Sequence, residues 1–297
     1  MIAVTSRSFS RHPVLRQELL ARYDEVRFND AGLSLRGDEL VEFLQDCEKA
    51  IVALEPIDDA LLARLPHLRV ISKIGVGLDT VDVASVERRG IRLAWRPGTN
   101  SRSVTELALA LMIMALRHVP LASDELRRGI WSQPKGTLLS GKMVGIVGYG
   151  HAGRDLASLL RPFDCRIVAS DVRPVDEPEV EHVPLDELLA EADVVSLHVT
   201  LHEATLGLLD RRRLGLMKPT AVLVNTARGG LVDEQALAEL LRDGRLAAAA
   251  FDVFSLEPPG DSELLALPNF LGTPHIGGST EEAILAMGRA AIEGLEG

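Results

Sequence analysis

The sequence predicts an α/β protein built from two doubly wound parallel sheets. Short apolar runs of strand length alternate along the chain with segments whose apolar residues recur at helical spacing. One such run, Met143–Val147, leads into a glycine-rich turn and then into a helical pattern. A length of 297 residues is sufficient for two units of this kind, each with its own core.

The composition excludes several classes of protein. With 46% hydrophobic and 25% charged residues the chain has ordinary globular composition, and its net charge of −11 argues against nonspecific binding to nucleic acid or anionic membranes. Cys47 and Cys165 lack metal-ligand spacing, so we expect reduced thiols and no metal. No apolar leader opens the chain, and Leu107–Leu116 is too short to span a bilayer. We therefore expect a cytoplasmic protein without membrane or nucleic-acid partners.

The first third predicts one parallel sheet with helices on both faces. The expected strands are Ile2–Thr5, Ala50–Leu54, Arg69–Ile74 and Ile91–Ala94, and the expected helices are Val14–Tyr23, Asp38–Asp46, Ala60–Leu65 and Val83–Arg89. Ligands bind at the carboxyl ends of strands in such sheets. There the loop Lys73–Asp79 carries Gly75 and Gly77 beside Lys73, which suits either a cradle for a carboxylate or phosphate or an ordinary turn.

A Pro-Gly turn at Arg96–Asn100 is the clearest break in the first half of the chain. The next helix, Val104–Arg117, is apolar on nearly all sides, so it must be buried, either between domains or in a dimer interface. Ser101 or Ser103 is a candidate cap for it. A further helix is expected over Leu121–Trp131, followed by a loop at Gly136–Gly141.

The glycine-rich turn predicts a dinucleotide site. Gly148, Gly150 and Gly153 follow the strand Met143–Val147 in the order G-x-G-x-x-G, and a helix is expected from Ala152. In this pattern the first glycine permits the tight turn, the second lets the backbone approach a pyrophosphate, and the third lets helix and strand pack closely. Asp171 ends the next strand, Arg166–Ser170, where a carboxylate accepts hydrogen bonds from a ribose diol. It would also repel a 2′-phosphate, which favours NAD.

Alternation of strands and helices continues to the end of the chain. The acidic stretch Arg173–Glu181 is expected to be solvated surface. The later elements are expected at Val194–His198, Ala221–Asn225 and Ala247–Phe251 for strands, and at Asp233–Arg242 and Gly277–Leu295 for helices. Two α/β units would then be joined near Pro97–Asn100 and Thr273–Gly277, with a cleft between them.

Three charged residues at the ends of expected strands or in loops form, beside a nicotinamide site, a set that hydride chemistry needs. Arg228 could hold a carboxylate and a neighbouring carbonyl in bidentate geometry. His275 could give or take a hydroxyl proton, and Glu257 could orient its ring. Taken singly, each is more simply explained as an ordinary surface or loop residue.

The chain resembles the D-2-hydroxyacid dehydrogenase family, in its phosphoglycerate-dehydrogenase-like branch. The segments that carry the resemblance are Lys73–Asp82, Pro97–Leu107, Gly141–Gly153, Met217–Gly230, Asp252–Pro258 and Thr273–Thr280. The resemblance implies a Rossmann NAD-binding domain at 99–274, inserted into a flavodoxin-like substrate domain at 1–98 and 275–297. It also implies a homodimer and an Arg228, Glu257 and His275 catalytic set, with Arg228 binding substrate and the His275–Glu257 pair as acid and base.

The resemblance assigns further residues to the cofactor and the substrate. The substrate residues are Lys73, Val76, Gly77, Asn100 and Arg228; the cofactor residues are Gly148, Tyr149, Gly150, His151, Ala152, Gly153, Asp171, His198, Thr205, Thr226, Ala227, Asp252 and Gly278. The chain departs from the family pattern at Thr200 and His202, and at Trp95 and Arg96.

The prediction is therefore NAD-dependent, reversible oxidation of a D-2-hydroxy acid to its 2-oxo acid. Lys73, Arg88 and Arg96 could meet a phosphate, which leaves 3-phosphoglycerate open beside hydroxypyruvate and glyoxylate. Two alternatives remain at this stage: an NADH-sensing, corepressor-like binding protein without significant turnover, and a dehydrogenase of another substrate type such as formate or phosphite.

Overall fold

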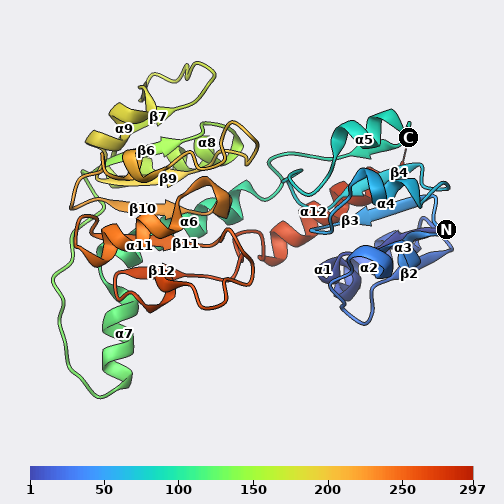
Figure 1. The fold of residues 1–297 in the computed structure, drawn as a ribbon, viewed down its shortest axis with the longest axis horizontal. Helices are drawn as coiled ribbons and strands as arrows, with labels where there is room; N and C mark the ends of the chain where they lie inside the picture. The colour runs from blue at the N-terminus through green and yellow to red at the C-terminus, as the bar shows by residue number, and fades with distance from the viewer. Residues whose placement is uncertain (297) are drawn as a thin grey trace. The chain divides into compact units, whose positions relative to one another are not determined.

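The computed structural model describes residues 1–296 and divides the chain into two compact units. The first unit contains residues 1–100 and 278–296, and the second is Ser101–Gly277. Each unit is built on one parallel sheet, of five strands in the first and seven in the second (Figure 1). His275 thus belongs to the second unit, although the sequence-based division groups it with the closing helix.

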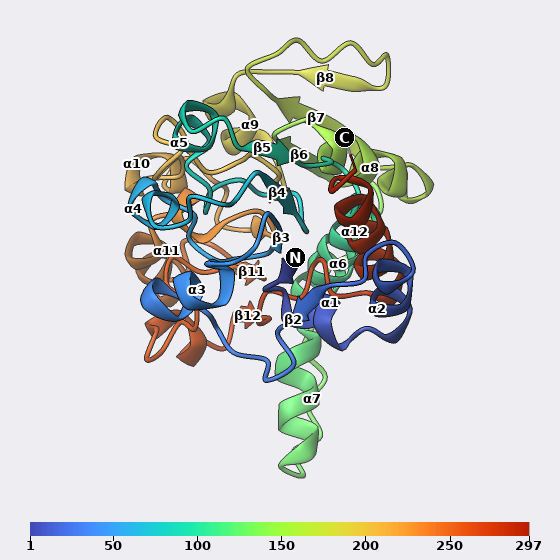
Figure 2. The ribbon, with the colours of Figure 1, turned by 90° about the vertical axis from the view of Figure 1, so that its right-hand side faces the viewer.

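The first unit has the strand order β2-β1-β3-β4-β5. Helices α1, α2 and α12 cover one face of the sheet, and α3, α4 and α5 cover the other (Figure 2). The strands are β1 (Ile2–Val4), β2 (Val26–Phe28), β3 (Lys49–Val52), β4 (Val70–Lys73) and β5 (Arg92–Ala94). The helices are α1 (Arg7–Arg11), α2 (Pro13–Leu20), α3 (Gly37–Leu44), α4 (Asp59–Ala63), α5 (Val83–Arg88) and α12 (Glu281–Glu293).

The closing helix returns to the first unit because its apolar stripe completes that core. Met287, Ala291 and Ile292 pack in one cluster with Phe9 and Leu15. The helix begins after Thr280, whose hydroxyl oxygen accepts a hydrogen bond from the backbone of Ala283 at 3.2 Å and so caps the first turn.

The second unit has the strand order β12-β11-β10-β9-β6-β7-β8. Helices α6 and α8 pack on one face and α9, α10 and α11 on the other. The strands are β6 (Met143–Val147), β7 (Arg166–Ser170), β8 (Val180–His182), β9 (Val194–Leu197), β10 (Val222–Asn225), β11 (Ala248–Phe251) and β12 (Phe270–Gly272). The helices are α6 (Ser101–Leu116), α7 (Val119–Arg127), α8 (His151–Leu160), α9 (Leu185–Glu191), α10 (Arg211–Leu214) and α11 (Glu234–Arg242), with 3₁₀ turns η1 (Arg161–Phe163), η2 (Gly229–Leu231) and η3 (Glu263–Ala266).

Helix α6 is buried on one side within its own unit. Ala108, Leu111 and Met112 pack against the sheet and α8. The expected serine cap is wrong, because α6 begins at Ser101, and the Ser103 hydroxyl donates instead to the carbonyl of Gly277. Among residues 1–296, no single helix is long and apolar enough to cross a membrane; α6 and α7 meet that test of length and composition only when taken together across their 66° bend.

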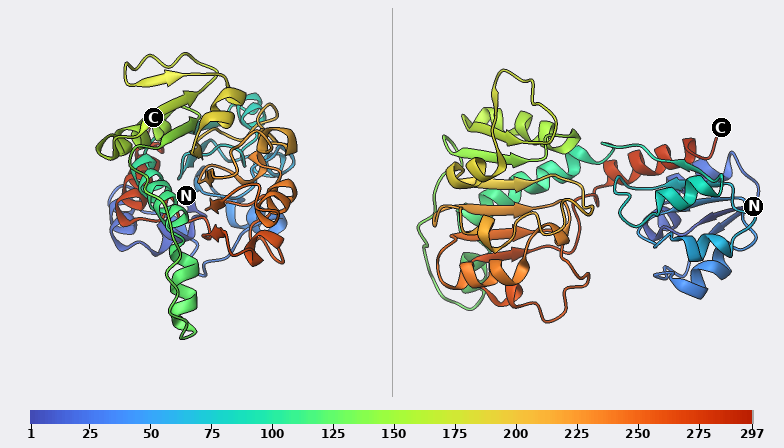
Figure 3. Two further views of the ribbon diagram at one scale, coloured as in Figure 1. Left: turned by 90° about the vertical axis from the view of Figure 1, so that its left-hand side faces the viewer. Right: turned by 45° about the horizontal axis from the view of Figure 1, so that its top comes forward.

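Helix α7 projects away from the sheet of the second unit (Figure 3). None of its residues is buried, and the chain that follows exposes Ile130 and Trp131.

Short edge elements complete the unit. The expectation that Arg173–Glu181 is plain solvated surface is wrong, because Val180 is buried and begins edge strand β8.

Candidate active site

The carboxyl edge of the seven-stranded sheet collects the candidate residues of the second unit. Arg228, Glu257 and His275 follow the adjacent strands β10, β11 and β12. Gly148 and Asp171 follow the neighbouring strands β6 and β7, on the other side of the point where the strand order reverses between β6 and β9. Such a switch point is where open α/β sheets bind ligands.

His275 and Glu257 form a direct pair. The imidazole Nδ1 lies 2.7 Å from the Glu257 Oε2, and the two side chains are 32% and 35% exposed. Burial of Glu257 favours its neutral form, but hydrogen bonds from His275 and from the backbone of Phe254 outweigh this, so the pKa of the Glu257 carboxyl lies below its usual range. The pairing holds the ring through Nδ1 and leaves Nε2 for proton transfer.

Arg228 lies near this pair, and its positive charge contributes to the lowered pKa of Glu257. Its guanidinium donates to the carbonyl of Ala227 at 2.7 Å, and its own carbonyl accepts from the buried amide of Asn225 at 2.8 Å. The next residue, Gly229, packs so closely that a Cβ would lie 1.9 Å from the carbonyl carbon of Phe254. This contact explains the glycine after the arginine.

Asp252 organises the loop that carries His275. The carboxylate of Asp252 is 1% exposed and accepts hydrogen bonds from the Thr273 hydroxyl at 2.6 Å and from the backbone of Ile276 and Gly277 at 2.8 and 2.7 Å. The His275 backbone, at φ +55°, donates to the Asp252 carbonyl at 2.8 Å. Few non-glycine residues adopt this left-handed conformation, so the loop bonds are what hold it. The predicted nicotinamide contact of Asp252 stays a prediction.

The three glycines of the turn differ in what surrounds them. Gly148 has φ +93°, and a Cβ there would lie 2.7 Å from the carbonyl carbon of His198. A Cβ on Gly153 would lie 2.2 Å from the Gly148 carbonyl oxygen, so helix and strand do pack closely at this point. Gly150 has no atom within 4 Å of its Cβ position and precedes α8 without a side-chain cap. The space and the unpaired first-turn amides suit an anionic group.

Asp171 is held at the same edge. Its carboxylate accepts a 2.7 Å hydrogen bond from the backbone of Tyr149 and a 2.9 Å bond from the backbone of Arg173. Across the sheet, Thr226 is 7% exposed, and its buried hydroxyl has no hydrogen-bond partner among the described residues. An unpaired buried hydroxyl is uncommon, and a bound polar group would satisfy it.

His198 and Thr205 shape the loop after β9. Burial lowers the pKa of His198 to about 4, and its ring lies 2.9 Å from the Ser196 hydroxyl, so the imidazole is neutral at pH 7. The Thr205 hydroxyl donates to the carbonyl of Thr200 at 2.7 Å and accepts from the backbone of His202 at 2.9 Å. The departures from the family pattern at Thr200 and His202 are therefore hydrogen-bonded to the Thr205 hydroxyl through their backbone.

The predicted substrate residues of the first unit lie in three places: in β4, in the glycine loop that follows it, and at Asn100. Lys73 is in β4, only 4% exposed, and its ammonium donates to the carbonyl of Ala53. The Val76 carbonyl, in the glycine loop with Gly77, accepts a 2.8 Å hydrogen bond from the indole of Trp95. Asn100 ends the first segment of this unit beside Gly278, where a Cβ would lie 3.2 Å from the Asn100 amide nitrogen.

Two polar partners of the site are missing from the sequence-based set. Ser196 pairs with His198, and the signal for it is their spacing of two residues at the end of an expected strand, Val194–His198, which would point both side chains to the same face. Glu177 accepts a 2.7 Å hydrogen bond from the Tyr149 hydroxyl. No local pattern marks Glu177, because the path of its loop decides the contact.

His151 and Ala152 begin α8, and Ala227 precedes Arg228, so these three predicted cofactor residues also lie at the carboxyl edge.

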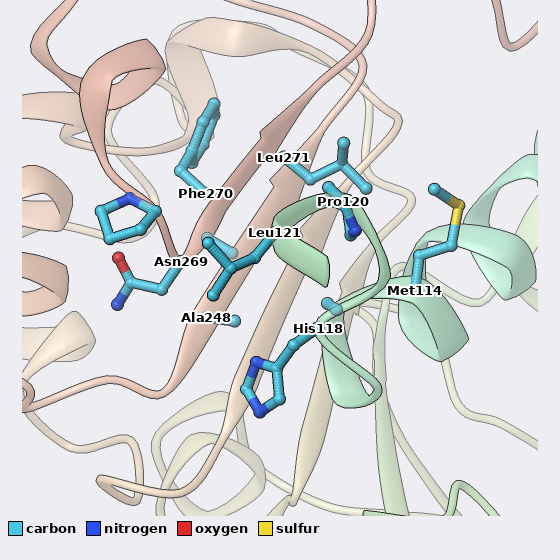
Figure 4. Close-up of a pocket in the computed structure, with 11 residues that line it drawn as sticks. Met114, His118, Pro120, Leu121, Ala248, Asn269, Phe270 and Leu271 are labelled. Atoms are coloured by element: carbon cyan, nitrogen blue, oxygen red, sulfur yellow. The ribbon is translucent and has the colours of Figure 1, made fainter. Parts of the chain in front are cut away.

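A shallow hollow lies elsewhere, at the amino ends of β11 and β12, lined by residues that include His118, Pro120, Leu121 and Phe270 (Figure 4). Its position on the opposite edge of the sheet separates it from the candidate active site. No group of three or more potential metal ligands occurs within residues 1–296.

The residues at the carboxyl edge fit a dinucleotide. The open space at Gly150, the uncapped start of α8 and the Asp171 carboxylate correspond to the needs of pyrophosphate and ribose. The family comparison agrees: residues 109–277 match the profile described as "D-isomer specific 2-hydroxyacid dehydrogenase, NAD binding domain". The chain belongs to this family of oxidoreductases, and its cofactor is NAD.

Individual relatives refine this result. The chain is 38% identical over 283 residues to a hydroxypyruvate reductase of Thermotoga maritima, covering 93% of this chain and 92% of the relative. It is 37% identical over 287 residues to a D-3-phosphoglycerate dehydrogenase of Methanocaldococcus jannaschii, covering 94% of this chain and 55% of the relative. The chain thus spans about half the length of the phosphoglycerate dehydrogenases that it matches.

A solved structure of a Thermus thermophilus protein is similar over nearly the whole chain. The TM-score is 0.87 at 36% identity, with coverage of 98% of this chain and 94% of that protein. This similarity confirms the predicted fold class of two parallel-sheet α/β domains.

Proposed function

We propose that the protein interconverts a small D-2-hydroxy acid and its 2-oxo acid, with Arg228, Glu257 and His275 as its catalytic set. The observation that carries the proposal is the 2.7 Å pair of His275 and Glu257, set beside Arg228 at the sheet edge that also holds the dinucleotide turn. A proton-transfer group and an anion-binding group are what reduction of a 2-oxo acid requires of the protein.

In this proposal Arg228 binds the substrate carboxylate and polarises the adjacent carbonyl, because a guanidinium offers two parallel donors to such a group. NAD, when bound, supplies or accepts the hydride. In the reductive direction His275 gives its Nε2 proton to the oxygen at C2, and the product hydroxyl forms. In the oxidative direction the same nitrogen takes that proton back.

Glu257 acts through His275. Its carboxylate lies against Nδ1, so it favours the protonated ring and keeps Nε2 directed outward from the pair. The lowered pKa of Glu257 means that this carboxylate stays ionised through the neutral pH range. A charged partner of constant sign is suited to a histidine that gains and loses a proton in each turnover.

We propose further that the substrate carries no phosphate. The cations that could meet one already have partners inside the first unit: Lys73 is buried against the Ala53 carbonyl, and Arg96 pairs with Glu293 at 2.7 Å. Arg88 donates to the Ser85 hydroxyl at 2.5 Å. Hydroxypyruvate and glyoxylate fit this class, and the name of the Thermotoga relative supports the first of them.

The test compares hydroxypyruvate, glyoxylate and 3-phosphohydroxypyruvate as oxidants of NADH, with binding of NADH measured separately by fluorescence. We expect kcat/KM to be highest for an acid without phosphate, and Arg228→Ala to abolish turnover while NADH binding stays within about twofold. Preference for the phosphorylated acid would refute the substrate class. A fully active Arg228→Ala variant would refute the role of the arginine.

We also propose that the protein is a homodimer that uses the α7 arm, residues 119–138. Within the described chain this arm exposes Leu126 by 57%, Ile130 by 51%, Trp131 by 80% and Leu138 by 68%, more apolar surface than a short surface segment usually leaves in water. Light scattering should give twice the chain mass, and Trp131→Glu should shift it towards the monomer. A monomeric wild-type protein would contradict this assignment.

The unpaired cysteines Cys47 and Cys165 support a reducing, cytoplasmic location.

A further inference from the structure

The loop between β7 and β8 is tied to the dinucleotide turn by one side chain. Tyr149 occupies the position between Gly148 and Gly150, and it is 3% exposed. Its backbone N–H donates to the Asp171 carboxylate, and its hydroxyl donates to Glu177 Oε2, both at 2.7 Å. One residue therefore contacts both the start and the middle of the loop.

Glu177 has a second partner on α8. The Arg154 Nε lies 3.4 Å from Glu177 Oε1, and the Arg154 guanidinium lies 5.6 Å from the centre of the Tyr149 ring. Glu177 is one-third exposed, which makes the bond from the buried tyrosine hydroxyl stronger than a bond between fully solvated groups. Burial and the Glu177 carboxylate both raise the pKa of Tyr149, so the hydroxyl keeps its proton and stays a donor.

The rest of the loop has weaker ties. His182 on β8 lies 3.1 Å from the Asp171 carbonyl and accepts a 3.4 Å bond from the backbone of Val175. Val172 is fully exposed and makes no core contact that could hold the loop. Val175 is partly buried against the core of the second unit, but among these contacts the Tyr149–Glu177 bond is the one that joins the segment to the dinucleotide turn.

We propose that Tyr149, through its hydroxyl bond to Glu177, is a positioning residue that sets the affinity of the protein for the adenosine half of NAD. The inference rests on the proposed function, which needs bound NAD, and on the predicted contact of Asp171 with a ribose of that cofactor. The bond holds the β7–β8 loop, and the loop holds the Asp171 carboxylate at the turn. The carboxylate that accepts hydrogen bonds from the ribose is therefore already ordered before the dinucleotide binds. Ordering before binding raises affinity because the complex then loses less conformational entropy.

The experiment measures dissociation constants of NADH and of ADP-ribose for wild type, Tyr149→Phe and Glu177→Ala. Phenylalanine keeps the buried ring and removes only the hydroxyl. We expect both constants to rise about two- to tenfold in each variant, the worth of one net hydrogen bond. The double variant should bind no more weakly than Glu177→Ala alone, since that variant already removes the bond to Tyr149.

Glu181→Ala is the matched control. Glu181 is a carboxylate on β8 that pairs with Arg166 at 2.7 Å in a solvent-exposed position, away from the turn. We expect its NADH and ADP-ribose constants to equal those of wild type. A variant that is merely destabilised would lower the melting temperature and kcat together without a matched change for the two ligands.

Wild-type affinity for both ligands in Tyr149→Phe and Glu177→Ala would overturn the proposal. Should Tyr149→Phe fail to fold, Glu177→Ala decides the question alone, because Glu177 lies outside the core. A wild-type protein that binds no NADH would instead overturn the proposed function, so the two failures are distinguishable.

Discussion

Replacing Glu257 with glutamine tests how the carboxylate acts on His275. Glutamine keeps the shape and an oxygen acceptor for Nδ1 but removes the charge. A full opposite charge about 4 Å away is worth about 1–4 kcal/mol between the limits of water and a protein surface. Because the pair is about one-third exposed, we take the lower half of that range, about 1–2 kcal/mol, which corresponds to a rate factor of about 5 to 30.

The sign differs between the two directions of the reaction. Reduction starts from the protonated His275, which the carboxylate stabilises, so reduction at pH 7.5 should fall about 5- to 30-fold in Glu257→Gln. Oxidation needs the neutral ring, so its rate at the same pH should change far less.

The assay is the pH dependence of kcat/KM in both directions, followed by NADH absorbance. Glu263→Gln is the control, because Glu263 is a carboxylate of the same unit that pairs with Arg242 at 2.8 Å on the surface. An unchanged reductive kcat/KM in Glu257→Gln, or an equal loss in both directions, would refute the assigned coupling.

Three further predictions follow from the turn and the strand beside it. Gly150→Ala should leave the melting temperature unchanged, because no atom lies within 4 Å of the added Cβ, yet raise the dissociation constant of NADH at least tenfold. Gly153→Ala should lower the free energy of unfolding by about 1–3 kcal/mol in urea titration, since its Cβ meets the Gly148 carbonyl. The pKa of His198 is lowered from 6.5 to about 4, so only the unfolded state gains this proton between these pH values. Wild type should therefore lose about 2–3 kcal/mol of stability from this residue as pH falls through that window, and His198→Gln should lack this loss; parallel pH–stability curves would contradict this assignment.

Local patterns account for what the sequence predicts well. The strand Met143–Val147 and the glycine turn are read from a few adjacent residues, and both lie where expected. Each residue type there meets a need set by its immediate neighbours, as the close approach of Gly153 to Gly148 illustrates. The α/β class follows from the same cause, because helical and strand periodicities are local.

Elements that depend on distant partners escape the sequence. Strands β2 and β12 have three residues each, too few for a period, and their partners in the sheet define them. The pairing of Tyr149 with Glu177 depends on the path of a loop. The neighbourhood of Arg228, Glu257 and His275 depends on the order β12-β11-β10, which no local pattern contains. Their chemistry beside a dinucleotide site and the resemblance to a family grouped them beforehand.

The most direct test of the account is NADH oxidation at 340 nm with hydroxypyruvate, in wild type and in His275→Asn. Asparagine cannot deliver a proton at neutral pH, so the rate should fall about 10²- to 10⁴-fold, the usual worth of general acid catalysis. NADH affinity should stay within about twofold of wild type. Turnover by wild type with this loss in the variant is the predicted result. NADH binding without turnover of any 2-oxo acid, or a variant as fast as wild type, would contradict it.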